Sequence, residues 1–130
     1  DSLEGLPASV NNENFVALIK DNINFPHEAQ EYLNNLFLTP LAQREEIINI
    51  IRSAGKEFYL QAFDAIPSEI LDWSETTKDI GSITGKKGKE LFMPLRCAIT
   101  GQTKGPELDR VVNLIGTEHV LKKLKEASEL

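Results

Sequence analysis

Apolar residues along the chain recur every three or four positions, and no segment shows the apolar and polar alternation of a β-strand. Residues that favour helix ends, mainly Asn, Asp, Thr, Pro and Gly, separate the apolar stretches. This pattern predicts helices over nearly the whole chain, and therefore an all-α fold.

Two helices are predicted near the start of the chain. The first follows Asn11 and Asn12, whose side-chain oxygens can accept hydrogen bonds from free backbone N–H groups at a helix start. The second occupies residues 25–37, with Pro26 at a position where a missing N–H group costs nothing. Their apolar faces are formed by Phe15, Val16, Leu18 and Ile19, and by Ala29, Tyr32, Leu33, Leu36 and Phe37.

Two strongly apolar helices follow. Thr39 and Pro40 repeat the start signal, and Gly55 marks the end of the helix that they open. The next helix ends before Pro67. The expected core positions of these two helices are Ile47, Ile48, Ile50, Ile51 and Ala54, then Phe58, Ala62, Phe63 and Ile66.

The last part of the chain contains further start and stop signals. Asp72 and Glu75 resemble a capping box that opens a helix running toward Gly85. The remaining boundaries are Thr100 and Gly101, which end a helix, Pro106 and Thr117, which begin two more, and Gly116, which separates those two.

The length and residue types limit what this chain can be. A chain of 130 residues forms one domain or two small subdomains. The single Cys97 excludes an internal disulfide, and with only His27 and His119 beside it no four-ligand zinc site can be assembled. We therefore expect a reducing, cytoplasmic environment, with both histidines in ordinary positions near helix starts.

No apolar run approaches the ~20 residues that span a membrane, and the first residues do not resemble a signal peptide. We expect a soluble chain with no membrane partner. Because the sequence begins at Asp1 rather than Met, we also expect it to be part of a longer or processed protein.

Charge is distributed unevenly along the chain. The net charge of −6 argues against unspecific nucleic-acid binding. Residues 1–70 carry four basic and eleven acidic side chains, whereas residues 71–130 carry ten basic and nine acidic ones. Within residues 86–104 there are five basic residues and one acidic residue, so a local positive patch is predicted on an acidic body. Such a body can still bind RNA, because its remaining surface repels phosphates and restricts docking.

Short motifs give little support for catalysis. Gly85–Gly88 matches the GXXG loop of KH domains, but a KH fold also needs strands, and none is predicted here. A phosphate-binding P-loop would need Ser or Thr after Lys89, where the chain has Glu90. No nucleophile, base and acid can be grouped from spacing, and Cys97 lies in an apolar helical run where an inert thiol is expected.

Pro94 lies inside the segment with the most positive charge. Because proline cannot donate a backbone hydrogen bond, we expect the helix to tighten or restart there and to aim Arg96 outward. A fixed guanidinium can bond two acceptors of a base or a phosphate, and residues 102–105 are expected to form an exposed turn beside it. In the alternative interpretation, Arg96 pairs with Glu90 or Asp109 and the lysines are merely solvated.

Residues 85–124, "GKKGKELFMPLRCAITGQTKGPELDRVVNLIGTEHVLKKL", closely resemble the C-terminal end of bacterial-type glutamyl-tRNA synthetases. The matching features are a Gly-Lys-rich turn, a Leu-Phe-Met-Pro-Leu-Arg segment, Thr-Gly, Gly-Pro-Glu-Leu and a closing pair of helices. The region around Trp73 and the stretch "NFVALIKDNI" fit the same family loosely. The resemblance is therefore strong over the last 60 residues and weaker before them.

The resemblance implies an all-α fold of small helical bundles of the class I anticodon-binding type. It implies a helical connecting subdomain at residues 1–70 and a C-terminal anticodon-binding subdomain at 71–130. Lys78 stands where the family often has arginine, so it keeps a charge and loses the two-pronged geometry. The RNA-contacting residues expected from the resemblance and from the charge pattern together are Lys78, Lys86, Lys87, Lys89, Arg96, Lys104, Gly105, Pro106 and Leu108.

The expected partners are the anticodon loop of tRNA and the N-terminal catalytic domain of the same polypeptide, in a monomer. The catalytic signatures of the family do not occur in these 130 residues, so we expect this chain itself to bind no cofactor and to catalyse nothing. The full-length enzyme would use ATP and magnesium to attach glutamate to tRNA. Two alternatives stay open from the sequence: a helical protein-interaction module whose basic turn binds an acidic partner, and a KH-like binder of single-stranded RNA.

Overall fold

The computed structural model describes residues 3–130, and within this range it contains eight α-helices, three short turns of other helical types and no strand. The all-α prediction is confirmed. The KH-like alternative is wrong, because the strands that it requires are missing from the described residues. No helix within this range is both long and apolar enough to cross a membrane.

The elements follow one another with short connections. Three turns, η1 (Lys20–Asn22), η2 (Asn34–Leu38) and η3 (Leu41–Gln43), lie in the first third of the chain, and η2 is a π-helix. The α-helices are α1 (Asn12–Ile19), α2 (Pro26–Leu33), α3 (Glu45–Ala54), α4 (Lys56–Ala65), α5 (Trp73–Thr84), α6 (Lys89–Thr100), α7 (Leu108–Ile115) and α8 (Thr117–Ser128).

Several predicted helix boundaries are confirmed at the atomic level. The Asn11 side chain accepts a hydrogen bond from a backbone N–H group in the first turn of α1 at 3.1 Å. The Asp72 carboxylate does the same for α5 at 2.9 Å. Gly85 ends α5 with a left-handed backbone (φ 73°), a conformation that costs glycine little. Gly116 separates α7 from α8 as predicted.

The predicted continuous helix over residues 25–37 is wrong in its last part. The α-helix ends at Leu33, and η2 follows it with a wider turn, in which the Thr39 N–H group donates to the Asn34 carbonyl at 2.8 Å. The wider turn accompanies tight packing on α6, because the Asn35 carbonyl oxygen lies only 2.6 Å from where a Cβ on Gly101 would stand. Tertiary packing of this kind overrides local helix periodicity.

The helix predicted to begin at Thr39 and Pro40 begins later. A single 3-10 turn, η3, comes first, and Arg44 has a non-helical backbone (φ −99°, ψ 86°) before α3 starts. The interruption places Leu41 in the core with no exposed surface. Its N–H group donates to the Glu126 carboxylate of α8 at 2.7 Å, so a distant side chain takes the place of a local helix partner.

The helix does not restart at Pro94, contrary to the prediction. α6 runs without interruption from Lys89 to Thr100 with Pro94 inside it. The carbonyl that loses its donor belongs to the exposed Glu90, where water can replace it. The Pro94 carbonyl accepts a hydrogen bond from the buried Tyr59 hydroxyl at 2.9 Å, and the helix is further held by burial of Leu95.

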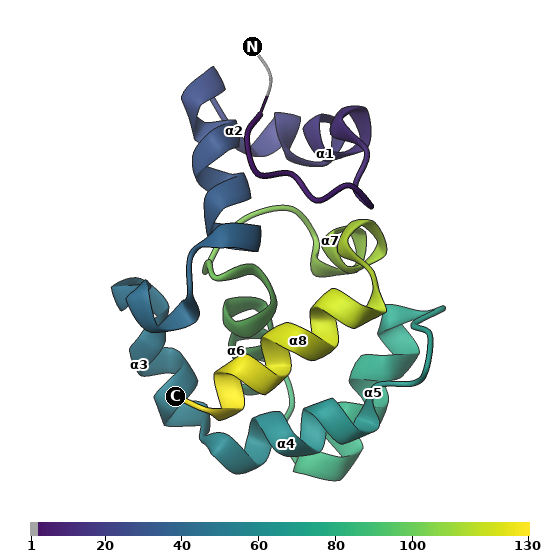
Figure 1. Ribbon diagram of the computed structural model, residues 1–130. Helices are drawn as coiled ribbons and strands as arrows, with labels where there is room; N and C mark the ends of the chain where they lie inside the picture. Colours follow the sequence, from purple (N-terminus) through teal and green to yellow (C-terminus); the bar gives the residue numbers. More distant parts are fainter. Residues whose placement is uncertain (1–2) are drawn as a thin grey trace.

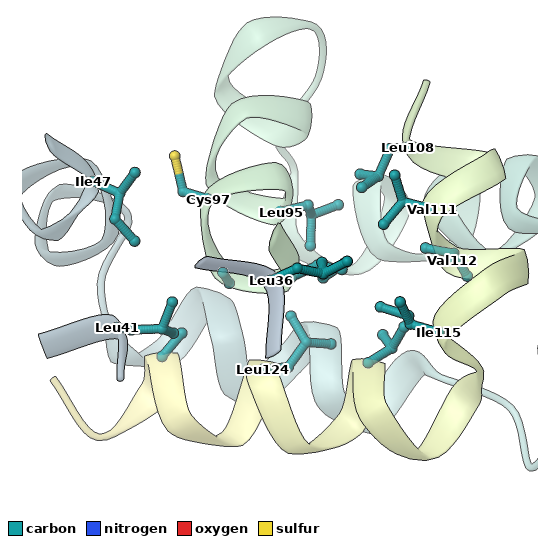
Figure 2. Packing of buried hydrophobic residues seen from close by; sticks show 14 of the residues in the cluster. Leu36, Leu41, Ile47, Leu95, Cys97, Leu108, Val111, Val112, Ile115 and Leu124 are labelled. Atoms are coloured by element: carbon teal, nitrogen blue, oxygen red, sulfur yellow. The ribbon is translucent and has the colours of Figure 1, made fainter. Parts of the chain in front are cut away.

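The core lies between helices from both ends of the chain. Figure 1 shows α8 crossing in front of α6, with α4 beneath them and α3 and α5 on either side. Leu36, Leu95 and Leu124, from η2, α6 and α8, point toward one another in Figure 2, and all three are fully buried. Helices from both sides of residue 70 therefore share one apolar cluster. The division into subdomains at residue 70 stays a prediction.

Candidate nucleic-acid interface

An open hollow of about 580 Å³ lies around Arg96, between the first turn of α5, the middle of α6 and the start of α7. We call it the Arg96 hollow. Its walls combine apolar, acidic and neutral polar side chains around this single basic group. The lining residues are Leu71, Asp72, Trp73, Ser74, Thr77, Phe92, Arg96, Glu107, Leu108, Asp109 and Asn113.

Local structure explains how these residues meet. The Asp72 cap starts α5 at Trp73, which is 6% exposed and anchors the helix in the core. On α6, Phe92 and Arg96 are four residues apart and so share one face. The intervening Leu95 is fully buried, which turns the face with Phe92 and Arg96 toward the hollow. Leu108 begins α7 and is 8% exposed.

The Arg96 guanidinium is half-buried and incompletely paired. Its Nη1 atom is inaccessible to solvent and has no hydrogen-bond partner among residues 3–130. The described residues also place neither Glu90 nor Asp109 in an ion pair with it. The structure therefore does not support the alternative interpretation, in which Arg96 pairs with Glu90 or Asp109. A guanidinium has five N–H donors in one plane, and Arg96 lines the hollow, so its donors other than the enclosed Nη1 can serve a ligand there.

The charges around Arg96 favour a neutral ligand over an anion. Three carboxylates, those of Asp72, Glu107 and Asp109, line the same hollow as the one guanidinium. The local charge is thus negative on balance, which disfavours a phosphate group at short distance. The carboxylates can accept hydrogen bonds from N–H groups while Arg96 donates to oxygen or nitrogen acceptors. A planar group that carries both hydrogen-bond donors and hydrogen-bond acceptors along its edge fits this arrangement.

Apolar surface completes the hollow. Phe92 is 45% exposed and Leu71 is 85% exposed, which is unusual for side chains of this size. Both line the Arg96 hollow together with Leu108. Proteins commonly stack an unpaired nucleobase on an exposed aromatic ring or an arginine, and both are present here.

The turn after α6 is fixed at its start by Thr100. The Thr100 hydroxyl donates to the Arg96 carbonyl at 2.7 Å and accepts from the Gln102 N–H group at 3.1 Å. Lys104 is exposed farther along this turn, and Gly105 has a backbone φ of 144° that other residues rarely adopt. A second hollow, of about 320 Å³, lies between this turn and α2. We call it the Tyr32 hollow; its lining includes Tyr32, Lys104 and Gly105.

The predicted lysines lie in separate places. Lys86 and Lys89 line a third hollow, of about 740 Å³, beside α3 and α4, and Lys87 is exposed in the loop between them. Lys78 is exposed on α5, where its Nζ atom lies 3.4 Å from the Glu75 carboxylate.

The nine predicted residues are thus brought together only in part. Arg96 shares one hollow with Leu108, Lys104 shares another with Gly105, and Lys86 shares the third with Lys89. The remaining predicted residue, Pro106, is buried just before α7.

Sequence reasoning missed several residues of the Arg96 hollow. Phe92 could have been found, because its spacing of four residues from Arg96 puts both on one helix face. Leu71 lies in a loop, Glu107 caps the start of α7, and Asn113 lies within α7. No motif in the sequence links these three residues to Arg96. Only the packing of α7 beside α5 brings them together.

The cysteine and the two histidines lie outside the three hollows. Cys97 is fully buried, and burial raises the pKa of its thiol to about 11; the inert thiol stays a prediction. His119 lies in the first turn of α8, where burial lowers its pKa and its Nε2 atom is 3.3 Å from the Leu36 carbonyl oxygen. His27 is exposed at the start of α2, as predicted.

Comparison with known proteins gives a family match over nearly the whole chain. The family model described as "Anticodon binding domain" matches residues 6–128. The chain is 38% identical over 118 residues to "Glutamate--tRNA ligase 1" of Halorhodospira halophila, covering 91% of this chain and 25% of that relative. It is 35% identical over 130 residues to the protein of the same name from Rickettsia akari, covering 98% and 28% respectively. No solved structure matches the chain.

The chain therefore spans about a quarter of the length of these curated relatives. The resemblance to glutamyl-tRNA synthetases seen in residues 85–124 is confirmed and extends over nearly all of the chain. The match supports the tRNA-related interpretation over the protein-interaction module. This chain belongs to the anticodon binding domain family.

Proposed function

We propose that this chain recognises the anticodon of a tRNA as part of a glutamate–tRNA ligase. The observation that carries the proposal is the Arg96 hollow, where a guanidinium without an ion-pair partner among residues 3–130 shares the walls with an aromatic ring and carboxylates. The family match and the glutamate–tRNA ligase relatives support it. In this proposal the chain supplies selectivity among tRNAs.

One unstacked base of the anticodon loop enters the Arg96 hollow and stacks on Phe92. Arg96 donates to acceptor atoms on the edge of the base, in the planar geometry that only arginine provides. The Glu107 and Asp109 carboxylates accept from N–H groups of the same base or exclude bases that present only acceptors there. A wrong base leaves buried polar groups unpaired, and that loss produces the discrimination.

The exposed lysines act on the RNA backbone in this proposal. Lys78, Lys86, Lys87, Lys89 and Lys104 are exposed and lie on α5, the following loop, the start of α6 and the turn after it. Ammonium groups in such positions neutralise phosphates without reading sequence. In this proposal, backbone groups at Gly105 and the part of Leu108 that lines the Arg96 hollow meet the loop itself, whereas the buried Pro106 supports the start of α7.

The remainder of the parent protein supplies the catalysis. We propose that an N-terminal catalytic domain activates glutamate with ATP and magnesium and joins it to tRNA, in a monomeric cytoplasmic enzyme. Within residues 3–130 no group of three or more His, Cys, Asp and Glu side chains is placed to hold a metal ion.

The proposal is tested by measuring the affinity of this chain for a glutamate tRNA transcript and for transcripts with single anticodon substitutions. At least one substitution should weaken binding by about 1–3 kcal/mol, the usual worth of one base contact. Raising the salt concentration should weaken binding of all transcripts in parallel, because phosphate contacts carry no base information. Equal affinity for every transcript would contradict the proposal.

A further inference from the structure

Tyr32 of α2 has a buried hydroxyl group without a hydrogen-bond partner. The side chain is 7% exposed, and no partner for its Oη atom exists among residues 3–130. The other tyrosine, Tyr59, is also buried, but its hydroxyl donates to the Pro94 carbonyl at 2.9 Å. Because an unpaired buried polar group lowers stability, phenylalanine would serve the fold at least as well at position 32. Stabilisation of the fold therefore does not explain the hydroxyl group, and we look for a role in binding instead.

The Tyr32 ring packs directly on the turn that follows α6. A Cβ atom added to Gly105 would stand 3.1 Å from Cε2 of the ring and 3.2 Å from its hydroxyl oxygen. The ring thus lies against the backbone beside Lys104, closer than most side chains at position 105 would allow without a shift of the ring. The conformation of this turn depends on the position of the ring.

The N-terminal half also holds the start of the same turn. Arg44 donates from Nε to the Gly101 carbonyl at 2.9 Å, and its side chain is 19% exposed. On the other side, the Asn35 carbonyl of η2 lies against Gly101 with no room for a side chain. Contacts from α2, η2 and the residue before α3 therefore fix both ends of the turn at residues 101–105.

Tyr32 also lies close enough to Arg96 for their charges to interact. Burial raises the pKa of the Tyr32 phenol to about 12, and the positive charge of Arg96 partly opposes this shift. The phenol is thus neutral at physiological pH, with an oxygen that can accept a hydrogen bond. Arg96 contributes the only other buried side-chain atom without a partner among the described residues, the donor Nη1. One unpaired acceptor and one unpaired donor lie in the same region of the core.

We propose that Tyr32 is a positioning residue for anticodon discrimination: its ring sets the turn at residues 101–105, and its hydroxyl accepts from Arg96 Nη1 when a base occupies the Arg96 hollow. This inference rests on the proposed function. It adds a contribution from α2, far from the basic segment in the sequence, to the selection of the base. The base draws the guanidinium into its reading position, and the hydroxyl holds the donor that faces away from the base.

The test is the discrimination factor, defined as the ratio of the dissociation constants of this chain for an anticodon-substituted transcript and for the glutamate tRNA transcript. Tyr32→Phe keeps the ring and removes the hydroxyl. It should lower this factor by roughly 10- to 100-fold, the worth of one hydrogen bond to a charged group. Its melting temperature should stay unchanged or rise, because an unpaired buried group has been removed.

Tyr59→Phe is the matched control, since it also removes one buried tyrosine hydroxyl but breaks an existing hydrogen bond. It should lower the melting temperature and leave the discrimination factor unchanged. In an Arg96→Lys background, which lacks Nη1, Tyr32→Phe should have no further effect on the factor.

The outcomes separate the two proposals. If the unmodified chain discriminates between the transcripts and Tyr32→Phe discriminates equally well, the role of the Tyr32 hydroxyl is refuted and the proposed function stands. An undiminished effect of Tyr32→Phe in the Arg96→Lys background refutes the coupling between the two residues. If the unmodified chain does not discriminate at all, both proposals are refuted.

Discussion

Individual residues around Arg96 decide what the hollow can bind. A lysine at this position would keep the charge, but the geometry of the site suits a planar group that can serve several acceptors at once. The surrounding carboxylates make the hollow unfavourable for a phosphate, although Arg96 belongs to the most basic segment of the chain. The segment's lysines and its arginine therefore have different targets: the RNA backbone for the lysines and a base for the arginine.

Phe92 provides the first prediction at this scale. Replacing it with Ala removes the exposed ring beside Arg96, and we expect tRNA binding to weaken by about 1–3 kcal/mol, the worth of one base stacked on an aromatic side chain. Folding should change little because the side chain is 45% exposed. Equilibrium binding of the glutamate tRNA transcript measures the effect.

Ile83→Ala is the matched control for Phe92. Ile83 is 53% exposed on α5, does not line the Arg96 hollow, and should tolerate the change without a loss of affinity. The stacking role of Phe92 is wrong if its substitution weakens binding no more than this control does.

At the level of elements, a partly buried carboxylate ties α8 to the turn before α3. The Glu126 carboxylate lies 3.0 Å from the Lys123 Nζ atom and accepts from the Leu41 N–H group at 2.7 Å. Lys123 is 4% exposed, so water can do little to replace this ion-pair partner. Glu126→Ala should therefore reduce the free energy of unfolding by about 3 kcal/mol, because it leaves a buried ammonium group unpaired. Urea-induced unfolding measures this loss.

Two comparisons sharpen the Glu126 prediction. Glu126→Gln keeps an acceptor for Leu41 and loses the charge, so its stability should lie between those of the parent and the Ala variant. Lys122→Ala changes an exposed residue of the same helix and should shift stability by no more than about 0.5 kcal/mol. A loss for Glu126→Ala as small as that for Lys122→Ala would show that the ion pair contributes nothing.

Elements were predictable from sequence where the signal is local. The caps at Asn11 and Asp72 depend on side chains two or three residues from the groups that they bind, and both predictions are confirmed. The π-helix η2 depends instead on close packing against Gly101, which is 66 residues from Asn35. The predicted helix restart at Pro94 was wrong because burial of α6 outweighs the one hydrogen bond that proline cannot make. Long-range contacts of this kind leave no periodic pattern in the sequence.

The candidate site also contains residues that the sequence indicates and residues that only long-range contacts bring in. Arg96 and Leu108 were found from the sequence through a family resemblance and local charge, and the structure places both in one hollow. From the sequence, Tyr32 was expected to be an ordinary core residue on an apolar helix face. That position gives no sign of a buried, unpaired hydroxyl. Its contact with Gly105 exists only because α2 packs beside the turn after α6.

Over the whole molecule, a strongly acidic first half is joined to a second half that carries most of the basic residues, although its lysines lie in separate places. Residues 1–70 are strongly acidic, and the exposed lysines proposed to contact RNA all belong to the second half of the chain. Repulsion between the acidic part and RNA limits the orientations in which a tRNA can dock. Long-range charge then orients the tRNA, and the short-range contacts of the Arg96 hollow select the base.

The most direct test of this account compares Arg96→Lys with Arg96→Ala in the proposed full-length ligase. The measurement is kcat/KM for glutamate tRNA and for transcripts with single anticodon substitutions at fixed salt. If Arg96 reads a base, Arg96→Lys should cost about 1–3 kcal/mol of transition-state binding for the cognate tRNA, and Arg96→Ala only slightly more. Lys87→Ala, the control for a backbone contact, should weaken charging of all transcripts about equally. Should Arg96→Ala charge cognate and substituted transcripts as the parent does, with folding intact, the base-reading role of the Arg96 hollow is contradicted.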